Sequence, residues 1–197
     1  AKGFDANNMT VTWYRSDGVV FVKTRVAGTW GGWAQQATQA APTAAVAASQ
    51  QLIHVRDEKA SGLNAGTSTT SYTTRTLNTV KTNTISGAAL ASNQITLPAG
   101  TYLFEVTAPA TRVGRHKAKV YNVTDGADAL IGTSANANSS GDYSEASRVC
   151  GVVTIAGAKA FDVRHRAAGA VANYGWGLAS SFGDVEVYAE ALIRKIS

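Results

Sequence analysis

Cysteine is nearly absent from this chain of 197 residues, since Cys150 is its single example. One cysteine cannot form an intrachain disulfide, and it cannot build a metal cluster that needs several thiolates. Cys150 lies in the apolar run Val149–Ile155, which predicts that it is buried as a small hydrophobic residue. The fold must therefore be stabilised by packing or by assembly rather than by cross-links.

Proline and charge are also scarce, with three prolines and charged residues at 16% of the chain. Few prolines leave strands uninterrupted, and a hydrophobic share of 45% supplies a core, which excludes a disordered chain. The net charge of +5 is a mild excess without a dense basic motif, so no nucleic-acid partner is expected. No apolar run approaches the roughly 20 residues of a membrane span, so no membrane insertion is expected.

Motifs for catalysis or cofactor binding are missing as well. The sequence has no H-E-x-x-H, no G-x-S-x-G and no phosphate-binding loop. Its histidines, His54, His116 and His165, stand apart in different strand candidates, which predicts residues on polar strand faces rather than ligands or bases. Asp125 and Asp128 flank a glycine, a pattern that indicates a turn first and a calcium site as the alternative. We expect a protein that is not an enzyme and that needs neither cofactor nor metal.

The first part of the chain divides into a small β unit and a link. Residues 1–33 predict a β knob, in which Ser16-Asp17-Gly18 connects the two strands of a hairpin. Trp30 and Trp33 lie among glycines, where they either pack over the hairpin, which we favour, or form an exposed stacking platform. Residues 34–50 are rich in alanine and glutamine with a central proline, which predicts a linker or neck.

Residues 51–197 indicate strands almost throughout. In residues 101–108 the side chains of Tyr102, Phe104 and Val106 share one face, as in a half-buried strand. Many strands at short spacing, joined by well-marked turns and without amphipathic helices between them, predict an all-β sandwich or jelly roll. The expected strands are 52–56, 101–108, 117–124, 130–133, 147–155, 158–166 and 183–196.

The last of these strands alternates in an unusual way, because both of its faces carry apolar residues. This predicts a partner on each side, a second sheet on one and a neighbouring subunit on the other. One face is expected to hold Val185, Val187, Ala189, Ala191 and Ile193, and the other Glu186, Tyr188, Glu190, Leu192 and Arg194.

Basic residues gather in one strand candidate. Arg115, Lys117 and Lys119 share a strand face, which makes either a basic stripe for anionic sugars or phosphates or a solvated outer face, the reading we favour. Arg164 and Arg166 form a second, smaller cluster, on the same face of their strand as Asp162.

Aromatic residues of the segment Ala167–Phe182 are the other candidates for binding, since aromatic rings on loops grip sugar faces and protein epitopes. The competing interpretation is that they plug the end of the sandwich or pack at a subunit axis. The predicted receptor contacts are the aromatic residues Tyr143, Tyr174 and Trp176, with Asn173, Arg112 and Arg115 as polar partners.

Three stretches resemble parts of tailed-bacteriophage tail fibres and receptor-binding proteins. The ending GWGLASSFG followed by EVYAEALIRKI resembles the last strands of such fibres. The stretches QLIHVRDEKASGLNAGTSTTSYTTRTLN and ITLPAGTYLFEVTAPA are similar to the first strands of trimeric jelly-roll heads of the C1q and tumour-necrosis-factor type. Residues 13–35, WYRSDGVVFVKTRVAGTWGGWAQ, resemble the end of the knob repeats of phage and pyocin fibres.

The resemblance implies a homotrimeric fibre tip in which residues 51–197 form a C1q/TNF-like head that binds the bacterial surface. The implied receptor is lipopolysaccharide or another surface glycan, and the implied location is the virion, acting outside the host cell beside other tail proteins. Two alternatives stay open. One is a structural virion component, such as a head decoration or a fibre joint, and the other is a polysaccharide-degrading tailspike module.

Overall fold

The computed structural model describes residues 7–15, 19–36 and 51–197. The chain divides into two compact units, Ala1–Val46 and Ala47–Ser197. The predicted turn at residues 16–18 and most of the predicted neck lie outside the described residues. The predicted boundaries of knob, neck and head therefore stay predictions.

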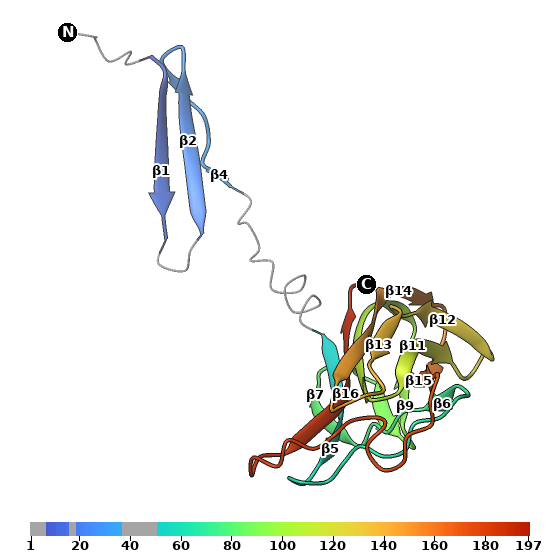
Figure 1. The fold of residues 1–197 in the computed structure, drawn as a ribbon. Coiled ribbons are helices and arrows are strands. Elements are labelled where there is room, and N and C mark those ends of the chain that lie inside the picture. The colour runs from blue at the N-terminus through green and yellow to red at the C-terminus, as the bar shows by residue number, and fades with distance from the viewer. Residues whose placement is uncertain (1–6, 16–18, 37–50) are drawn as a thin grey trace. The chain divides into compact units, whose positions relative to one another are not determined.

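The first unit is a hairpin with two short additions (Figure 1). Strand β1 (Met9–Tyr14) pairs antiparallel with β2 (Val20–Val26), and β3 (Thr29–Trp30) and β4 (Ala34–Gln35) both pair with β2. The rings of Trp30 and Trp33 lie 5.7 and 5.8 Å from the Nζ atom of Lys23 on β2. They stay 40% and 50% exposed, so the two tryptophans contact the hairpin while leaving much of each ring open.

The second unit is a sandwich of two antiparallel sheets (Figure 1). Sheet I has the strand order β14-β10-β16-β5-β7, and sheet II has the order β12-β11-β15-β9-β8, with β13 paired to β11 and β6 to β15. Sheet I consists of β5 (Leu52–Lys59), β7 (Thr79–Asn83), β10 (Gly100–Thr111), β14 (Ser144–Ile155) and β16 (Glu186–Lys195). Sheet II consists of β6 (Thr73–Thr74), β8 (Ala89–Ala91), β9 (Gln94–Leu97), β11 (Gly114–Asn122), β12 (Ala127–Ile131), β13 (Ala135–Ala137) and β15 (Lys159–Ala167).

From β9 onward the chain passes repeatedly between the two sheets, which is the jelly-roll arrangement. The predicted fold class, an all-β chain with a jelly-roll sandwich, is confirmed. Among the described residues, no helix is long and apolar enough to cross a membrane.

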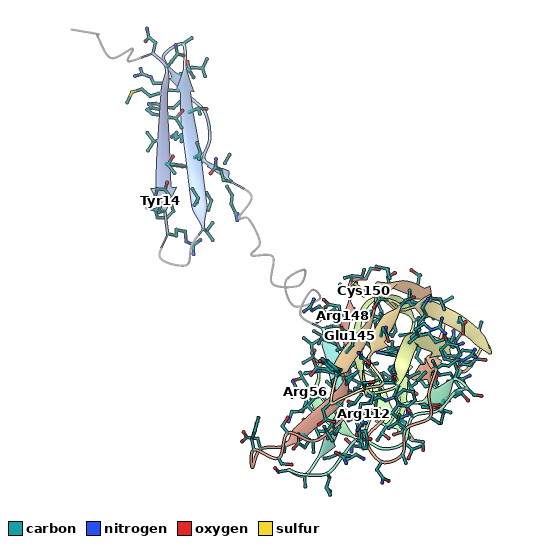
Figure 2. The ribbon with its side chains drawn as sticks, viewed as in Figure 1. Tyr14, Arg56, Arg112, Glu145, Arg148 and Cys150 are labelled. Atoms are coloured by element: carbon teal, nitrogen blue, oxygen red, sulfur yellow. The ribbon has the colours of Figure 1, made fainter. Side chains whose placement is uncertain are left out.

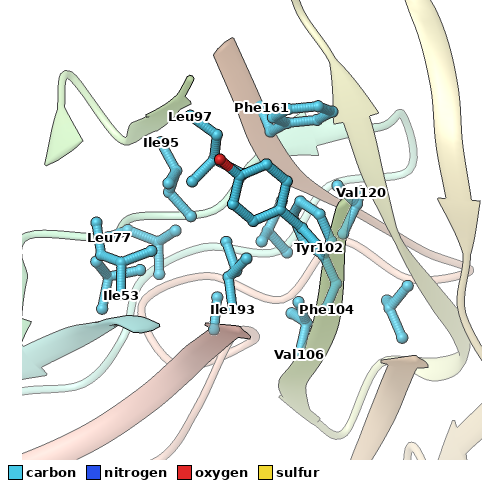
Figure 3. Packing of buried hydrophobic residues seen from close by; sticks show 14 of the residues in the cluster. Ile53, Leu77, Ile95, Leu97, Tyr102, Phe104, Val106, Val120, Phe161 and Ile193 are labelled. Carbon is cyan, nitrogen blue, oxygen red and sulfur yellow. The ribbon is translucent and has the colours of Figure 1, made fainter. Parts of the chain in front are cut away.

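The core lies between the sheets, and Figure 3 shows its centre. Tyr102, Phe104 and Val106 point inward from β10 and are at most 3% exposed, as their alternation predicts. The rings of Phe104 and Phe161 meet edge to face with centroids 5.4 Å apart, which joins sheet I to sheet II. Further residues of this cluster are Ile53, Val55, Ile95, Leu97, Val120, Val163 and Ile193.

Strand β16 occupies the middle of sheet I, between β10 and β5, rather than an edge. Its register with β5 shifts between Val187 and Glu190, where the strand has a bulge. Tyr188 and Ala189 are both buried as a result, whereas Val187 is 43% exposed. The predicted alternation is therefore wrong before the bulge: Val185 and Val187 face outward, and the expected inner face begins at Ala189.

The prediction that Cys150 is buried is also wrong, because its side chain is exposed. Figure 2 labels this residue. It lies on the outer face of β14, directly opposite Glu105 of β10, while the neighbouring Val149 points into the core. The apolar run suggested burial on both faces, but sheet I has one buried and one open face at this strand.

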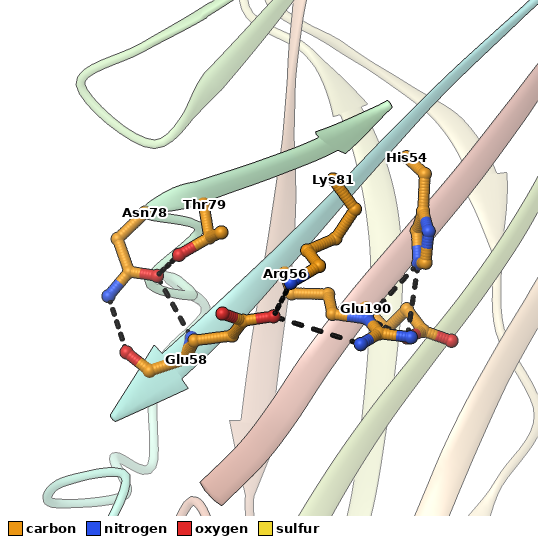
Figure 4. A network of polar contacts seen from close by, with 7 residues as sticks. All are labelled: His54, Arg56, Glu58, Asn78, Thr79, Lys81 and Glu190. Carbon is orange, nitrogen blue, oxygen red and sulfur yellow. Dashed lines mark hydrogen bonds and ion pairs between the residues drawn. The ribbon is translucent and has the colours of Figure 1, made fainter. Parts of the chain in front are cut away.

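The outer face of sheet I carries a polar network along β5 and its neighbours (Figure 4). The Glu190 carboxylate accepts a hydrogen bond from Nε of Arg56, at 2.5 Å, and lies 3.1 Å from Nε2 of His54. Glu58 pairs with Lys81 of β7 at 3.1 Å. His54 is thus on a polar strand face, as predicted.

Candidate functional site

The candidate site lies at one end of the sandwich, which we name the loop end. It is the end reached by residues 60–72, 112–113, 138–143 and 168–185, as the pairings Lys59 with Glu186 and Thr111 with Ser144 show. The chain enters the sandwich at the opposite end, where Leu52 pairs with Arg194. The segments that contain the six predicted receptor contacts all reach the loop end.

The two longest segments of the loop end are tied to each other by backbone hydrogen bonds. The Ala65 amide donates to the Gly177 carbonyl, the Trp176 amide to Gly66, and the Ser68 amide to Val171, each at 3.0 Å. Residues 168–185 are thus held along residues 60–72. The segment predicted as a loop thus has a course fixed by backbone hydrogen bonds.

Glu186 adds a further constraint where residues 178–185 lead into β16. Its carboxylate accepts hydrogen bonds from the amides of Ser180, Ser181 and Gly62, at 3.0, 2.8 and 3.2 Å. These bonds, led by that from Ser180, hold the pKa of Glu186 below its usual range. A charged carboxylate therefore fixes the course of this segment.

Trp176 lies inside the loop end and is 7% exposed. Its ring stacks on His165, with centroids 4.5 Å apart and planes 15° apart, and the guanidinium of Arg75 lies 5.0 Å from its centre. Ala110, Val113, Ala137 and Ala167 complete this second hydrophobic cluster. Burial does not fit the prediction of Trp176 as a receptor contact, whereas the competing interpretation, a residue that plugs the end of the sandwich, describes its position.

Beneath Trp176 runs a row of buried polar groups, here called the buried row: Arg75, His165 and His116. Arg75 donates from Nη1 to Nδ1 of His165 at 2.8 Å, and Nε2 of His165 lies 2.9 Å from Nδ1 of His116. Arg75 also donates to the carbonyl groups of Pro109 and Trp176. The prediction that His116 and His165 lie on polar strand faces is therefore wrong, since both point into the sandwich and are at most 4% exposed.

Hydrogen-bond chemistry fixes the protons along the buried row. A guanidinium only donates, so Nδ1 of His165 accepts, Nε2 of His165 carries the proton, and Nδ1 of His116 accepts in turn. Both rings are neutral in this arrangement. Burial, with Arg75 as a further cause, lowers the pKa of His165 to about 2 and that of His116 to about 4. Nε2 of His116 is left as a buried donor without a partner among the described residues.

Four of the predicted contacts form one cluster at the surface of the loop end. Arg112 donates from Nη1 to the hydroxyl of Tyr174 at 3.1 Å, and its amide donates to the Tyr143 carbonyl at 3.0 Å. Asn173, next to Tyr174, bonds through its amide to Thr67 at 3.1 Å. Tyr143 is 62% exposed. The structure thus brings Arg112, Tyr143, Asn173 and Tyr174 together, while their role as receptor contacts stays a prediction.

Arg115, the sixth predicted contact, belongs to a different site. It lines a pocket of about 530 Å³ on sheet II at the loop end, which we name the basic pocket. Arg115 and Lys117 come from β11, and Arg166 comes from β15, where it lies directly opposite Lys117. The other lining residues are Thr70, Tyr72, His116, Ser134, Ala135, Asn136, Ala167 and Ala168.

Charges on the outer face of sheet II fall into two groups. Lys119 pairs with Asp128 on β12, and Arg164 pairs with Asp162, so the part of the face away from the loop end is neutralised. The rings of Tyr72 and Tyr121 lie against Lys119, at 4.1 and 5.4 Å from its Nζ atom. Lys119, the third residue of the predicted basic stripe, is therefore paired with an acid and packed against aromatic rings on the outer face of the sheet.

The part of the same face at the basic pocket is not neutralised. Within the described residues, Arg115, Lys117 and Arg166 form no ion pair with a carboxylate. Like charges directly opposite on neighbouring strands destabilise a sheet, and two charges about 6 Å apart repel by roughly 0.7 kcal/mol even in water. The fold therefore tolerates an unfavourable gathering of three cations around a hollow.

Comparisons with known proteins bear on the fold alone. No protein-family model matches the sequence, and no curated protein matches it. Among solved structures, the sandwich is similar to the globular domain of zebrafish complement 1qA protein, with 14% identity, a TM-score of 0.46, and coverage of 75% of this chain and 98% of that one. It is also similar to murine APRIL at pH 5.0, with 10% identity, a TM-score of 0.46, and coverage of 73% and 97%.

The two sheets and their strand order, rather than this distant likeness, carry the fold assignment. Each sheet has a central five-strand path, in which β16 lies between β10 and β5 in one and β15 lies between β11 and β9 in the other. The predicted jelly-roll sandwich is confirmed as a fold.

The two aspartates weighed as a calcium site take separate partners. Asp125 pairs with Lys159 and also accepts from the Asn122 side chain at 2.8 Å, while Asp128 pairs with Lys119. No group of three histidine, cysteine or acidic residues that could hold a metal ion occurs in the described part of the chain. The arrangement is that of a turn whose acids are bound by lysines.

The sequence did not predict that the residues of the buried row lie together, and it predicted only part of the basic pocket. Tyr72, Ser134 and Asn136 reach the pocket from segments that do not share a strand with the cations. One signal was present, because alternation places His165 on the same face as Phe161 and Val163. A histidine on the apolar face of a strand needs a buried partner.

Proposed function

We propose that this chain is the tip of a tailed-phage fibre, a homotrimeric adhesin that binds a glycan on the bacterial surface. The observation that carries the proposal is the basic pocket, an uncompensated cationic hollow at the loop end. The chain enters the sandwich at the opposite end. The basic pocket and the Arg112 cluster therefore lie at the end of the sandwich that the chain does not enter. The sequence resemblance to phage fibres supports the same assignment.

Binding fits the basic pocket better than cleavage. Hydrolysis of a glycosidic bond by the common routes needs two carboxyl groups on either side of the bond, roughly 5 to 9.5 Å apart. The described lining offers cations, hydroxyl groups, an amide and a tyrosine ring, and it includes no aspartate or glutamate. We therefore place glycan binding, rather than a tailspike hydrolase, at this site.

Trimer formation is part of the proposal, and the outer face of sheet I is the surface that suits it. Leu103, Cys150, Val152 and Leu192 alternate there with charged residues across β10, β14 and β16. Val152 is 55% exposed in the single chain. Interfaces combine a largely apolar centre with a polar rim, and this face offers both kinds of side chain. Three pockets on one tip gain avidity, so weak individual sites suffice for attachment.

Cell binding and solution mass together test the proposal. The full chain is measured by size exclusion with light scattering, where three chains of 20.4 kDa are expected to associate. Fluorescently labelled protein is then applied to a panel of bacterial strains. Binding to some strains, competed by their own purified surface polysaccharide, is the expected result.

Other outcomes overturn the proposal in distinct ways. A trimer that binds no strain favours a structural virion component, a fibre joint or a head decoration. Shortening of the polysaccharide during incubation favours a degrading tailspike module. A stable monomer removes the avidity that the mechanism requires.

A further inference from the structure

The three cations of the basic pocket, Arg115, Lys117 and Arg166, point to the chemistry of its ligand. Lys117 and Arg166 are direct cross-strand neighbours, and Arg115 lies two residues before Lys117 on the same strand face. Within the described residues none of them is neutralised by a carboxylate. A ligand that supplies negative charge removes this repulsion, whereas a neutral ligand leaves it in place.

Neutral hydrogen-bonding groups surround these cations. Thr70, Ser134 and Asn136 line the pocket, and hydroxyl and amide groups can donate to ligand oxygens. The two arginines present planar donor forks that match phosphate and carboxylate oxygens in pairs, and lysine adds a point charge. This donor set is suited to an oxyanion rather than to a metal cation or an apolar group.

His116 lies between Arg115 and Lys117 on β11, but its side chain is 4% exposed and points into the sandwich, away from the face that carries the cations. The buried row assigns its proton to Nε2, and that atom has no partner among the described residues. Buried donors in folded proteins are nearly always satisfied. This unused donor lies on the inner side of sheet II, so the donor set that faces a ligand in the basic pocket consists of the three cations and the neutral groups around them.

The size of the pocket indicates what carries the anion. A volume of about 530 Å³ lies within the range of roughly 300 to 1,000 Å³ that holds small organic ligands, and it far exceeds a bare oxyanion. The additional room, bordered by Tyr72, accommodates a sugar ring. We propose that the basic pocket binds the acidic substituent of a surface sugar, a phosphate or carboxylate group, together with the ring that bears it. This inference rests on the proposed function, because it names the glycan class that the adhesin takes.

Titration of the full chain with four small probes tests the inference. The probes are glucose, glucose 6-phosphate, glucuronate and inorganic phosphate. Binding of each probe is measured at low salt from the NMR chemical-shift changes of backbone amides. Glucose 6-phosphate and glucuronate are expected to bind at least tenfold more tightly than glucose, with the largest shifts in β11, β13 and β15. The stronger of the two identifies a phosphorylated or a uronic-acid sugar as the source of the anion. Equal affinity for glucose and both acidic sugars overturns the inference.

Matched variants connect the binding to these residues. The double variant Lys117→Gln with Arg166→Gln removes two charges and keeps long polar side chains, and it is expected to weaken acidic-sugar binding at least tenfold. Lys159→Gln is the control, because Lys159 lies at the other end of β15 and pairs with Asp125. Unchanged acidic-sugar affinity in the double variant, with wild-type amide spectra elsewhere, contradicts the inference.

The same variants separate failure of the inference from failure of the proposed function. Cell binding that survives in the double variant leaves the adhesin proposal standing and moves its receptor site elsewhere, so the inference about the pocket fails. Acidic-sugar binding without attachment to any strain supports the pocket and overturns the adhesin.

Discussion

Replacing His165 by glutamine is expected to change how stability depends on pH. The side-chain carbonyl of glutamine can accept the hydrogen bond from Arg75, and its amide can donate to Nδ1 of His116, so both bonds of the buried row are kept. What is lost is a group that titrates. The stacking of the ring on Trp176 is also lost, which lowers stability by about 0.5–1.5 kcal/mol at every pH.

The sign follows from the pKa values of the two states. Burial lowers the pKa of His165 to about 2 in the folded chain, whereas an unfolded histidine takes up its proton near pH 6.5. The unfolded state therefore binds more protons below pH 6.5, and the stabilisation by the neutral ring is complete above that pH and is lost as the pH falls. With His116, whose pKa is lowered to about 4, the same argument applies.

The magnitude is set by linkage. One histidine that stays neutral in the folded state and charges in the unfolded state costs about 2 kcal/mol of stability between pH 7 and pH 5. The wild-type chain, which has two such rings in the buried row, should lose roughly 4 kcal/mol from them over this interval, and His165→Gln about half of that. Between pH 7 and pH 5 the free energy of unfolding therefore falls by about 2 kcal/mol less in the variant than in the wild type. The loss of stacking on Trp176 lowers the stability of the variant by the same amount at both pH values.

Urea unfolding at a series of pH values from 5 to 7.5 measures this difference. Asp57, with a pKa raised mainly by burial, and Glu186, with a pKa lowered by backbone hydrogen bonds, also titrate with folding, but both are present in the two proteins and cancel in the comparison. Parallel stability curves for wild type and variant would refute the assignment of neutral, buried rings. NMR signals of His165 that titrate near pH 6.5 in the folded wild type would refute it independently.

Three other substitutions and one condition give further checks. Trp176→Ala should lower the free energy of unfolding by about 3–5 kcal/mol in urea unfolding, because it empties the plug of the loop end; a loss under 1 kcal/mol contradicts this position. Gly177→Ala should lower the melting temperature, since a Cβ would overlap the ring of Tyr188 and the residue has a φ of +153°; an unchanged value contradicts that geometry. Tyr174→Phe removes the hydroxyl that Arg112 contacts and should cost about 1 kcal/mol in urea unfolding, with an unchanged midpoint as the contrary result. Raising NaCl from 50 to 500 mM should weaken glucose 6-phosphate binding and leave glucose binding unchanged, and salt-independent binding of both contradicts the charge argument.

Local alternation predicts the parts of this fold that depend only on neighbouring residues. The inward face of Tyr102, Phe104 and Val106 follows from period-two spacing, and so does the jelly-roll class, from many short strands between turns. The bulge in β16 does not follow, because it arises from pairing with β5, more than 120 positions earlier in the chain. One extra residue there reverses the face of everything before it.

The candidate site was harder to predict for the same reason. Arg115 and Lys117 share a strand, so their clustering is visible in the sequence, but the position of Arg166 opposite Lys117 depends on the register between β11 and β15. Tyr72 comes from a segment about 40 residues before them. The burial of Trp176 could not be read from the sequence, because residues 60–72 and 168–185 are held together by hydrogen bonds that no local pattern reports.

The entry of the chain at Leu52, at the end of the sandwich opposite the basic pocket, has a mechanical consequence. A particle that pulls on the chain ahead of Leu52, while its ligand is held at the loop end, loads β5 along its length. The hydrogen bonds from β5 to β16 and β7 lie perpendicular to such a pull. All of these hydrogen bonds therefore carry the load at the same time and must break together, instead of breaking one after another. In the proposed adhesin, attachment would therefore resist a pull along the fibre better than a sideways force on an edge strand.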